Sequence, residues 1–190
     1  FYQLYAEGYM PWEWHEPLKK LAEDLGLILF STPFDATAVD FLEKLNVPCY
    51  KIASYEATDI PLIKKVASKK KPVIISLGFA DLEEIDLSIK TLKDEGVEEI
   101  IGLQCTTSYS DKENAENTNL RTMMDIKKRY GILSGLSDNM GGIEVPALAA
   151  AMEASIIEKH LVVKHDPSIF DDRFSLDKEE FKNMVDKIRR

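Results

Sequence analysis

The chain has 190 residues, 45% of them hydrophobic and 30% charged, with a formal net charge of −9. These values are typical of one globular domain with a sizeable core. The negative charge argues against nucleic acid, or an anionic membrane, as the main partner. No apolar run is long enough to span a membrane, no signal peptide is visible, and Cys49 and Cys105 match no disulfide framework or metal motif. We therefore expect a cytoplasmic domain with both cysteines as core thiols.

Short apolar runs alternate with helical patterns along the whole chain. The runs that predict strands are 27–34, 49–54, 72–78, 99–106, 132–138 and 155–161. The helix signals, in chain order, are an apolar stripe over 18–25 followed by Gly26, an N-cap at Asp35, a capping box of Asp81 and Glu84, a stretch over 120–130 closed by Gly131, and a start at Ser175. Such alternation predicts a parallel sheet covered by helices.

Two architectures fit this order, an open doubly wound sheet and a closed barrel. No G-x-G-x-x-G motif follows a predicted strand, which disfavours a dinucleotide-binding sheet. Nearly every predicted strand ends in polar residues, and the carboxyl ends of barrel strands are where barrel active sites are built. We predict an α/β fold, a (β/α)₈ TIM-type barrel that is incomplete here, with about six of its eight βα units present.

Lys51 lies in the middle of an apolar predicted strand. A lysine that faces a barrel interior is costly unless an anion neutralises it. A bound phosphate or carboxylate would do so, with hydroxyl groups from Ser54, Ser76 and Ser137 as hydrogen-bond donors. Alternatively, Lys51 faces a helix, extends to solvent, or pairs with an internal carboxylate such as Glu158.

The last predicted strand carries Glu158 and His160 on one face and Lys159 on the other. A histidine at a strand end is a metal ligand, a general acid or base, or a hydrogen-bonded core residue. His15 lies at a helix start and His165 in a charged loop, where we expect solvated surface positions.

Several motifs in this order are similar to one family. They are "YMPWEWH", "FSTPFDATAVDFLEKL", "YKIASYE", "GLSD", "ASIIEKH" and "FSLDKEEFKNMVD". Through them the chain resembles the sialic acid synthase (NeuB-like) family, barrel enzymes that condense phosphoenolpyruvate with an N-acetylated amino sugar. The segments "LYAEGYMPWEWH" and "CTTSYSDKENAENTNL" are closest to the pseudaminic acid synthase branch. The alternatives are the N-acetylneuraminate or legionaminic acid synthase branch, and a catalytically silent homologue or fragment with a binding or assembly role.

The resemblance implies a role for each matching residue. Phosphoenolpyruvate is held in the family at positions that match Lys51, Ser54, Ser76 and Ser137, and the same pocket is lined by Thr32 and Thr107. The acceptor sugar is contacted at positions that match Glu56, Tyr109 and Asp171. One of two histidines that bind a divalent metal matches His160. Lys51, Glu56 and His160 are thereby the candidate catalytic residues. The metal would be Mn²⁺ or Mg²⁺, polarising the sugar aldehyde as a Lewis acid.

The chain also departs from the family pattern. The second metal histidine is Asn139, a weaker oxygen ligand, so we expect weak metal binding there. "SLGF" (76–79) replaces "STGM", and Ser110 stands where a proline is usual. The family's first two βα units and its small C-terminal domain are not among residues 1–190, which begin at Phe1. We expect one partial barrel domain, inactive alone, from a longer protein that the resemblance implies is a homodimer.

Overall fold

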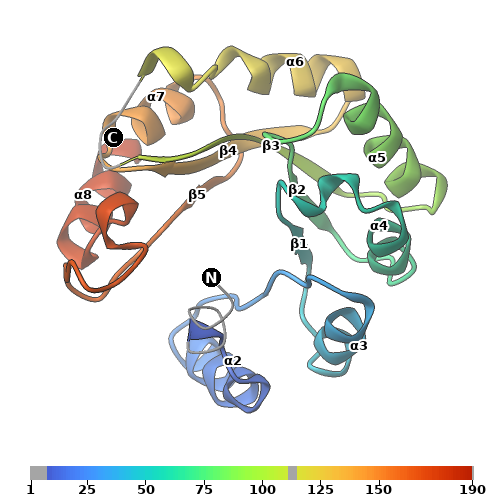
Figure 1. Ribbon diagram of the computed structural model, residues 1–190, viewed down its shortest axis with the longest axis horizontal. Coiled ribbons are helices and arrows are strands. Elements are labelled where there is room, and N and C mark those ends of the chain that lie inside the picture. Colours follow the sequence, from blue (N-terminus) through green and yellow to red (C-terminus); the bar gives the residue numbers. More distant parts are fainter. Residues whose placement is uncertain (1–7, 111–114, 190) are drawn as a thin grey trace.

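The computed structural model describes residues 8–110 and 115–189. Five parallel strands form one sheet in the order β1-β2-β3-β4-β5. They are β1 (Tyr50–Ile52), β2 (Val73–Ser76), β3 (Ile100–Ser110), β4 (Leu133–Met140) and β5 (Ile157–Lys159). The sheet curls into an arc whose outer side carries the helices, as Figure 1 shows. The fold is therefore the incomplete α/β barrel that the sequence predicts.

The described residues form seven α-helices, four of which begin or end at a residue that the sequence indicates. They are α2 (His15–Asp24), α3 (Ala36–Lys44), α4 (Ile60–Ala67), α5 (Leu82–Asp94), α6 (Arg121–Tyr130), α7 (Glu144–Ala151) and α8 (Lys178–Ile188), with short 3₁₀ turns η1 (Trp12–Trp14), η2 (Glu56–Thr58), η3 (Ala115–Asn117) and η4 (Asp172–Phe174). Asp35 caps α3, and Asp81 with Glu84 forms the capping box of α5. Gly131 ends α6 with a left-handed φ of 64°, which glycine adopts without steric cost.

The prediction of a strand over 27–34 is wrong. This segment is extended, but no strand ladder reaches it within the described ranges, and its apolar side chains Leu27, Ile28 and Phe34 are 62%, 75% and 66% exposed. A strand forms only when a neighbouring strand accepts its backbone hydrogen bonds. The segment adjoins the β1 end of the open arc (Figure 1), so its apolar run remains unpaired.

The predicted start of the last helix at Ser175 is also displaced. The N-cap of α8 is Asp177, whose carboxylate accepts hydrogen bonds from the N–H groups of Glu179 and Glu180 at 2.9 Å each. The side chain of Glu180 in turn accepts a hydrogen bond from the backbone N–H of Asp177, which completes a capping box. Ser175 instead donates its hydroxyl to the carbonyl of Asp171 at 2.7 Å. A carboxylate two residues further along is the better cap because it satisfies two helix N–H groups.

The core lies between the sheet and its outer helices. One apolar cluster packs β1, β2 and α3 to α5, and a second consists of Met123, Leu136, Met140, Val145 and Ala149. Every residue of β1 and β2 is buried, including the polar Lys51 and Ser76. Because alternate side chains of a strand point to opposite faces, Lys51 and Ser76 lie on the inner face of the arc, while Tyr50, Ile52, Val73 and Ile75 point to the outer, apolar cluster.

The contact between β4 and β5 requires a glycine at position 135. A Cβ atom added there would lie 2.2 Å from the carbonyl oxygen of Ile156. We expect Gly135→Ala to force β5 away and to lower the free energy of unfolding by about 1 to 3 kcal/mol, the usual cost of overpacking. Urea denaturation measures this. Gly131→Asn is the control, since asparagine tolerates a left-handed φ, and equal losses in both variants would contradict the close approach.

Candidate active site

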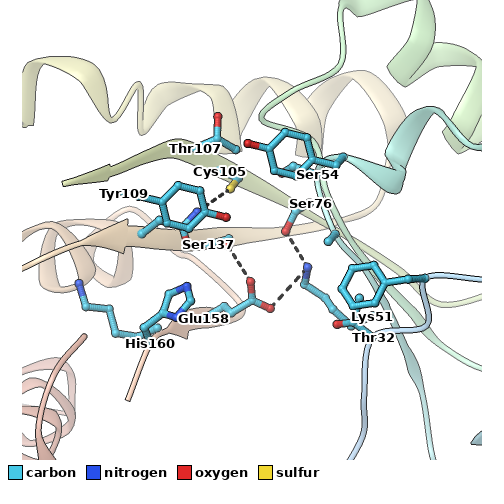
Figure 2. A pocket seen from close by; sticks show the side chains of 15 residues that line it. Thr32, Lys51, Ser54, Ser76, Cys105, Thr107, Tyr109, Ser137, Glu158 and His160 are labelled. Atoms are coloured by element: carbon cyan, nitrogen blue, oxygen red, sulfur yellow. Dashed lines mark hydrogen bonds and ion pairs between the residues drawn. The ribbon is translucent and has the colours of Figure 1, made fainter. Parts of the chain in front are cut away.

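The carboxyl ends of the strands meet at a cavity of about 260 Å³ on the inner face of the arc (Figure 2). It is lined by Thr32, Phe34, Lys51, Ala53, Ser54, Tyr55, Ser76, Cys105, Thr107, Tyr109, Ser137, Asn139, Glu158, Lys159 and His160. Most of the residues singled out in the sequence are therefore brought together, from all five strands or the turns that follow them. Lys51 shares this face with Ala53, as strand alternation predicts.

Lys51 is a buried cation that lines the cavity, with a side chain 6% exposed. Its Nζ donates to Ser76 Oγ at 2.9 Å and to the carbonyl of Ile52 at 3.0 Å. It also lies 3.5 Å from Glu158 Oε2, while Ser137 donates to Glu158 Oε1 at 2.6 Å. Burial lowers the pKa of Lys51, and the Glu158 carboxylate opposes that effect. The internal ion pair considered for Lys51 is thus present, in the same cavity as the hydroxyl groups of the anion-site hypothesis.

His160 follows β5 directly, on the side of the cavity opposite Lys51. Its ring meets that of Phe174 edge-on at a centroid distance of 4.9 Å, and its Nδ1 lies 3.8 Å from Asp171 Oδ2. Burial lowers the pKa of His160 below its ordinary value of 6.5, and the Asp171 carboxylate opposes this. The imidazole is therefore neutral near pH 7, the form that binds a cation or accepts a proton.

Asn139 and Tyr109 complete this side of the cavity. Asn139 donates its Nδ2 to the carbonyl of Thr106 at 3.3 Å and to Cys105 Sγ at 3.4 Å, which leaves Oδ1 as its ligand atom. Tyr109 has a φ of 45°, unusual for tyrosine, within a register shift of β3 between Thr106 and Ser110. Such bulges redirect side chains next to functional sites.

Two predicted site residues do not line this cavity. Glu56 lies in η2 just beyond β1; its Oε2 is buried without a hydrogen-bond partner among the described residues, and burial raises its pKa while Lys51 opposes this. Asp171 lines an adjoining cavity of about 710 Å³, between the N-terminal helices and the loop before α8. Thr32 and Phe34 line both cavities, so the two are neighbours.

The family model for the NeuB family matches residues 1–190, the full length of the chain. The chain belongs to the NeuB family. It is 37% identical over 188 residues to the pseudaminic acid synthase of Campylobacter jejuni, covering 99% of this chain and 54% of the relative. It is 38% identical over 179 residues to the N,N'-diacetyllegionaminic acid synthase of Legionella pneumophila, covering 92% of this chain and 50% of the relative.

The chain is also similar to solved structures. The N-acetylneuraminic acid synthetase of Leptospira borgpetersenii, solved in complex with citrate, matches with a TM-score of 0.89 and 30% identity, over 95% of this chain and 62% of that one. The NeuB-family chain spans about half the length of the curated relatives it matches. Among its described residues, no helix is long and apolar enough to cross a membrane.

Sequence reasoning missed several residues of this candidate site. Cys105 and Tyr55 line the cavity, and Phe174 packs on His160. Alternation along β3 would have found Cys105, which is two residues from Thr107. The surface position expected for His15 is wrong: its side chain is buried against Phe41, with ring centroids 5.0 Å apart.

His165 lies outside the cavity, between two carboxylates. Its Nδ1 lies 2.8 Å from Asp172 and its Nε2 3.0 Å from Glu180; Glu180 and Asp177 together with His165 form a group whose ligand atoms all lie within 4.8 Å of one another. The carboxylates of Glu180 and Asp172 raise the pKa of His165. The raised pKa favours the protonated imidazole, which has no lone pair for a metal, and both ring nitrogens lie within hydrogen-bonding distance of a carboxylate. We therefore interpret this group as an ion-pair network.

This network should make stability depend on pH. Because the pKa of His165 is raised in the folded protein, its contribution is complete below the ordinary value of 6.5 and is lost as the pH rises through the raised value. We expect the thermal midpoint to fall from pH 6 to pH 8 by a small amount, since the pairs are solvent-exposed. His165→Gln should flatten that dependence; an identical pH profile in both proteins would contradict it.

Proposed function

We propose that this chain forms the phosphoenolpyruvate-binding part of a nonulosonic acid synthase, which joins phosphoenolpyruvate to an N-acetylated amino sugar. The observation that carries the proposal is Lys51, a buried ammonium group in a cavity that also holds the hydroxyls of Ser54, Ser76 and Ser137. A phosphate or carboxylate needs both a positive charge and several hydrogen-bond donors. The cavity offers this combination within a chain whose overall charge is negative.

The internal carboxylate is compatible with anion binding. Glu158 has a side chain 41% exposed, so it can move toward solvent when an anion takes its place beside Lys51. An arriving anion would raise the pKa of Lys51 again, because the ammonium would be neutralised at closer range. Thr32 and Thr107, which line the same cavity, would add hydroxyl groups.

The proposed reaction forms a bond between C3 of phosphoenolpyruvate and the aldehyde carbon of the sugar. Water then adds at C2, and phosphate leaves by C–O cleavage. We place the acceptor sugar toward the adjoining cavity, near Tyr109 and Asp171. Burial raises the pKa of Glu56 and so favours its protonated form, which supports a part in acceptor binding or proton transfer.

The residues present fit a weakly held divalent cation. His160 supplies a neutral imidazole, and its Nδ1 faces Asp171, which leaves Nε2 for a cation. Asn139 supplies an amide oxygen in the same cavity. One nitrogen and otherwise oxygen ligands suit Mn²⁺ or Mg²⁺ better than Zn²⁺. When bound, such a cation would supply Lewis-acid polarisation of the aldehyde.

The acceptor is proposed to be the precursor of pseudaminic acid. The support is the opening segment of the sequence and the likeness to pseudaminic acid synthases, one of which is 37% identical. The legionaminic acid synthase at 38% identity is equally close. Assay of the full-length protein with each acceptor sugar separates the two branches. A further candidate is a catalytically silent homologue, which the replacement of a metal histidine by Asn139 favours.

The first test of this function removes the buried cation. Lys51→Met should weaken phosphoenolpyruvate binding by about 30-fold or more, because truncating one partner of a buried charge pair costs about 2 to 5 kcal/mol. The fold should persist, since Glu158 is partly exposed and removing a buried charge relieves its desolvation. Calorimetric titration of the full-length protein measures the affinity.

The control for this test is Lys127→Met. Lys127 is 54% exposed and pairs with Glu153 on the surface, away from the cavity. The control should bind phosphoenolpyruvate as the wild type does. If a folded Lys51→Met variant bound with unchanged affinity, the role proposed for Lys51 would be wrong.

The second test concerns the metal. Asn139→His should strengthen Mn²⁺ binding by about 10- to 100-fold, the range typical of changes around a metal site. Titration of Mn²⁺ into both proteins, followed by calorimetry, measures the difference. His165→Gln is the control, because it disrupts the exposed His165 network without touching the cavity. If wild type and Asn139→His bound Mn²⁺ equally weakly, the proposed metal site would be wrong and the silent homologue would be favoured.

A further inference from the structure

Asp138 and Lys159 form a buried ion pair beside the cavity, which Lys159 lines and Asp138 does not. Asp138 Oδ2 and Lys159 Nζ are 2.7 Å apart, and both side chains are 0% exposed. Lys159 also donates to the carbonyl of Met140, and Asp138 Oδ1 accepts from the Met140 N–H at 3.1 Å. Asp138 alternates with Ser137 and Asn139 along β4, so those two residues line the cavity while Asp138 does not.

The surroundings of this pair are apolar. Leu136 and Met140, on the same side of β4, are buried with Val145 and Ala149 of α7. A buried ion pair in such a place is weak evidence for stability, because desolvation of two charges offsets their attraction. Apolar residues of similar size often hold a fold equally well. The best attested use of a buried polar contact is to select one arrangement among several.

Strand β5 is the element that needs such selection. It has only 3 residues, and all of them are of intermediate burial. Its register against β4 pairs Leu136 with Ile157, Ser137 with Glu158 and Asp138 with Lys159. A slip of one residue would turn every side chain of β5 to the opposite face. Glu158 and His160 would then turn away from the cavity, and the ammonium group of Lys159 would turn toward it.

We propose that Asp138 and Lys159 are positioning residues that fix the register of β5, so that Glu158 and His160 face the cavity. Lys159 is the residue of β5 whose side chain is fully enclosed, and its partner Asp138 stands directly opposite in the ladder. The pair therefore acts on the site through the two residues that flank Lys159. Neither charged group contacts the substrate in this proposal.

The test replaces both charges in the full-length protein by apolar groups of similar size, Asp138→Leu with Lys159→Met. We expect a folded protein in which hydrogen exchange over residues 155–161 accelerates by about tenfold or more, while β1 to β3 keep their protection. Phosphoenolpyruvate affinity should fall by about 10-fold or more. The exposed pair Lys127 and Glu153, replaced in the same way, is the matched control and should change neither.

Only the affinity measurement rests on the proposed function. If wild type binds no phosphoenolpyruvate, that function fails, yet hydrogen exchange still decides the positioning role. Wild-type exchange over residues 155–161 in the double variant would overturn it. Asp138→Asn, which keeps the acceptor for the Met140 N–H, covers the case of a double variant that does not fold. Local acceleration in Asp138→Asn supports the proposal; equal acceleration in all strands overturns it, because the pair would then hold the whole fold.

Discussion

The ion pair between Lys51 and Glu158 joins the two ends of the sheet. Lys51 belongs to β1 and Glu158 to β5, the first and last strands in sheet order. Their side chains meet at 3.5 Å because the sheet curls far enough to bring its edges face to face. Ser76 and Ser137 add hydroxyls from two intervening strands. The cavity exists only in a curled sheet, so the curvature that comes from strand twist and the outer helices is itself part of the site.

The positive charge of Lys51 in the cavity is opposite in sign to the net charge of the chain. A chain of net charge −9 repels small anions at long range. Binding therefore depends on the short-range environment of Lys51, where low solvent exposure strengthens each charge interaction. Glu158 neutralises the buried ammonium group of Lys51, and its own carboxylate stays partly exposed to solvent. Around the cavity, burial moves the pKa values of His160 downward and Glu56 upward, which favours the neutral form of each.

Strand periodicity, together with polar residues at the strand ends, predicted the barrel-like sheet. It left the direction of Lys51 open, and the family resemblance favoured the inward one. The periodicity failed at 27–34, where the apolar pattern is right for a strand but the described residues supply no neighbouring strand. The sequence pattern also failed to predict helix α7, because "EVPALAAA" is apolar on all sides and lacks the polar face of a surface helix. Lys159 was placed on the correct face, but its partner Asp138 is 21 residues away, and only the register of β4 and β5 brings them together.

The burial of Asp138 and Lys159 has a consequence for behaviour on heating. The hydration of charged groups becomes less favourable as temperature rises, so the penalty for enclosing this pair decreases. Apolar contacts around it, such as those of Leu136 and Met140, gain little over the same range. The order of β5 against β4 is thus held by an interaction whose net contribution improves with heat more than that of the packing beside it. On heating, we expect the loops of the barrel to become mobile before the pairing between β4 and β5 is lost.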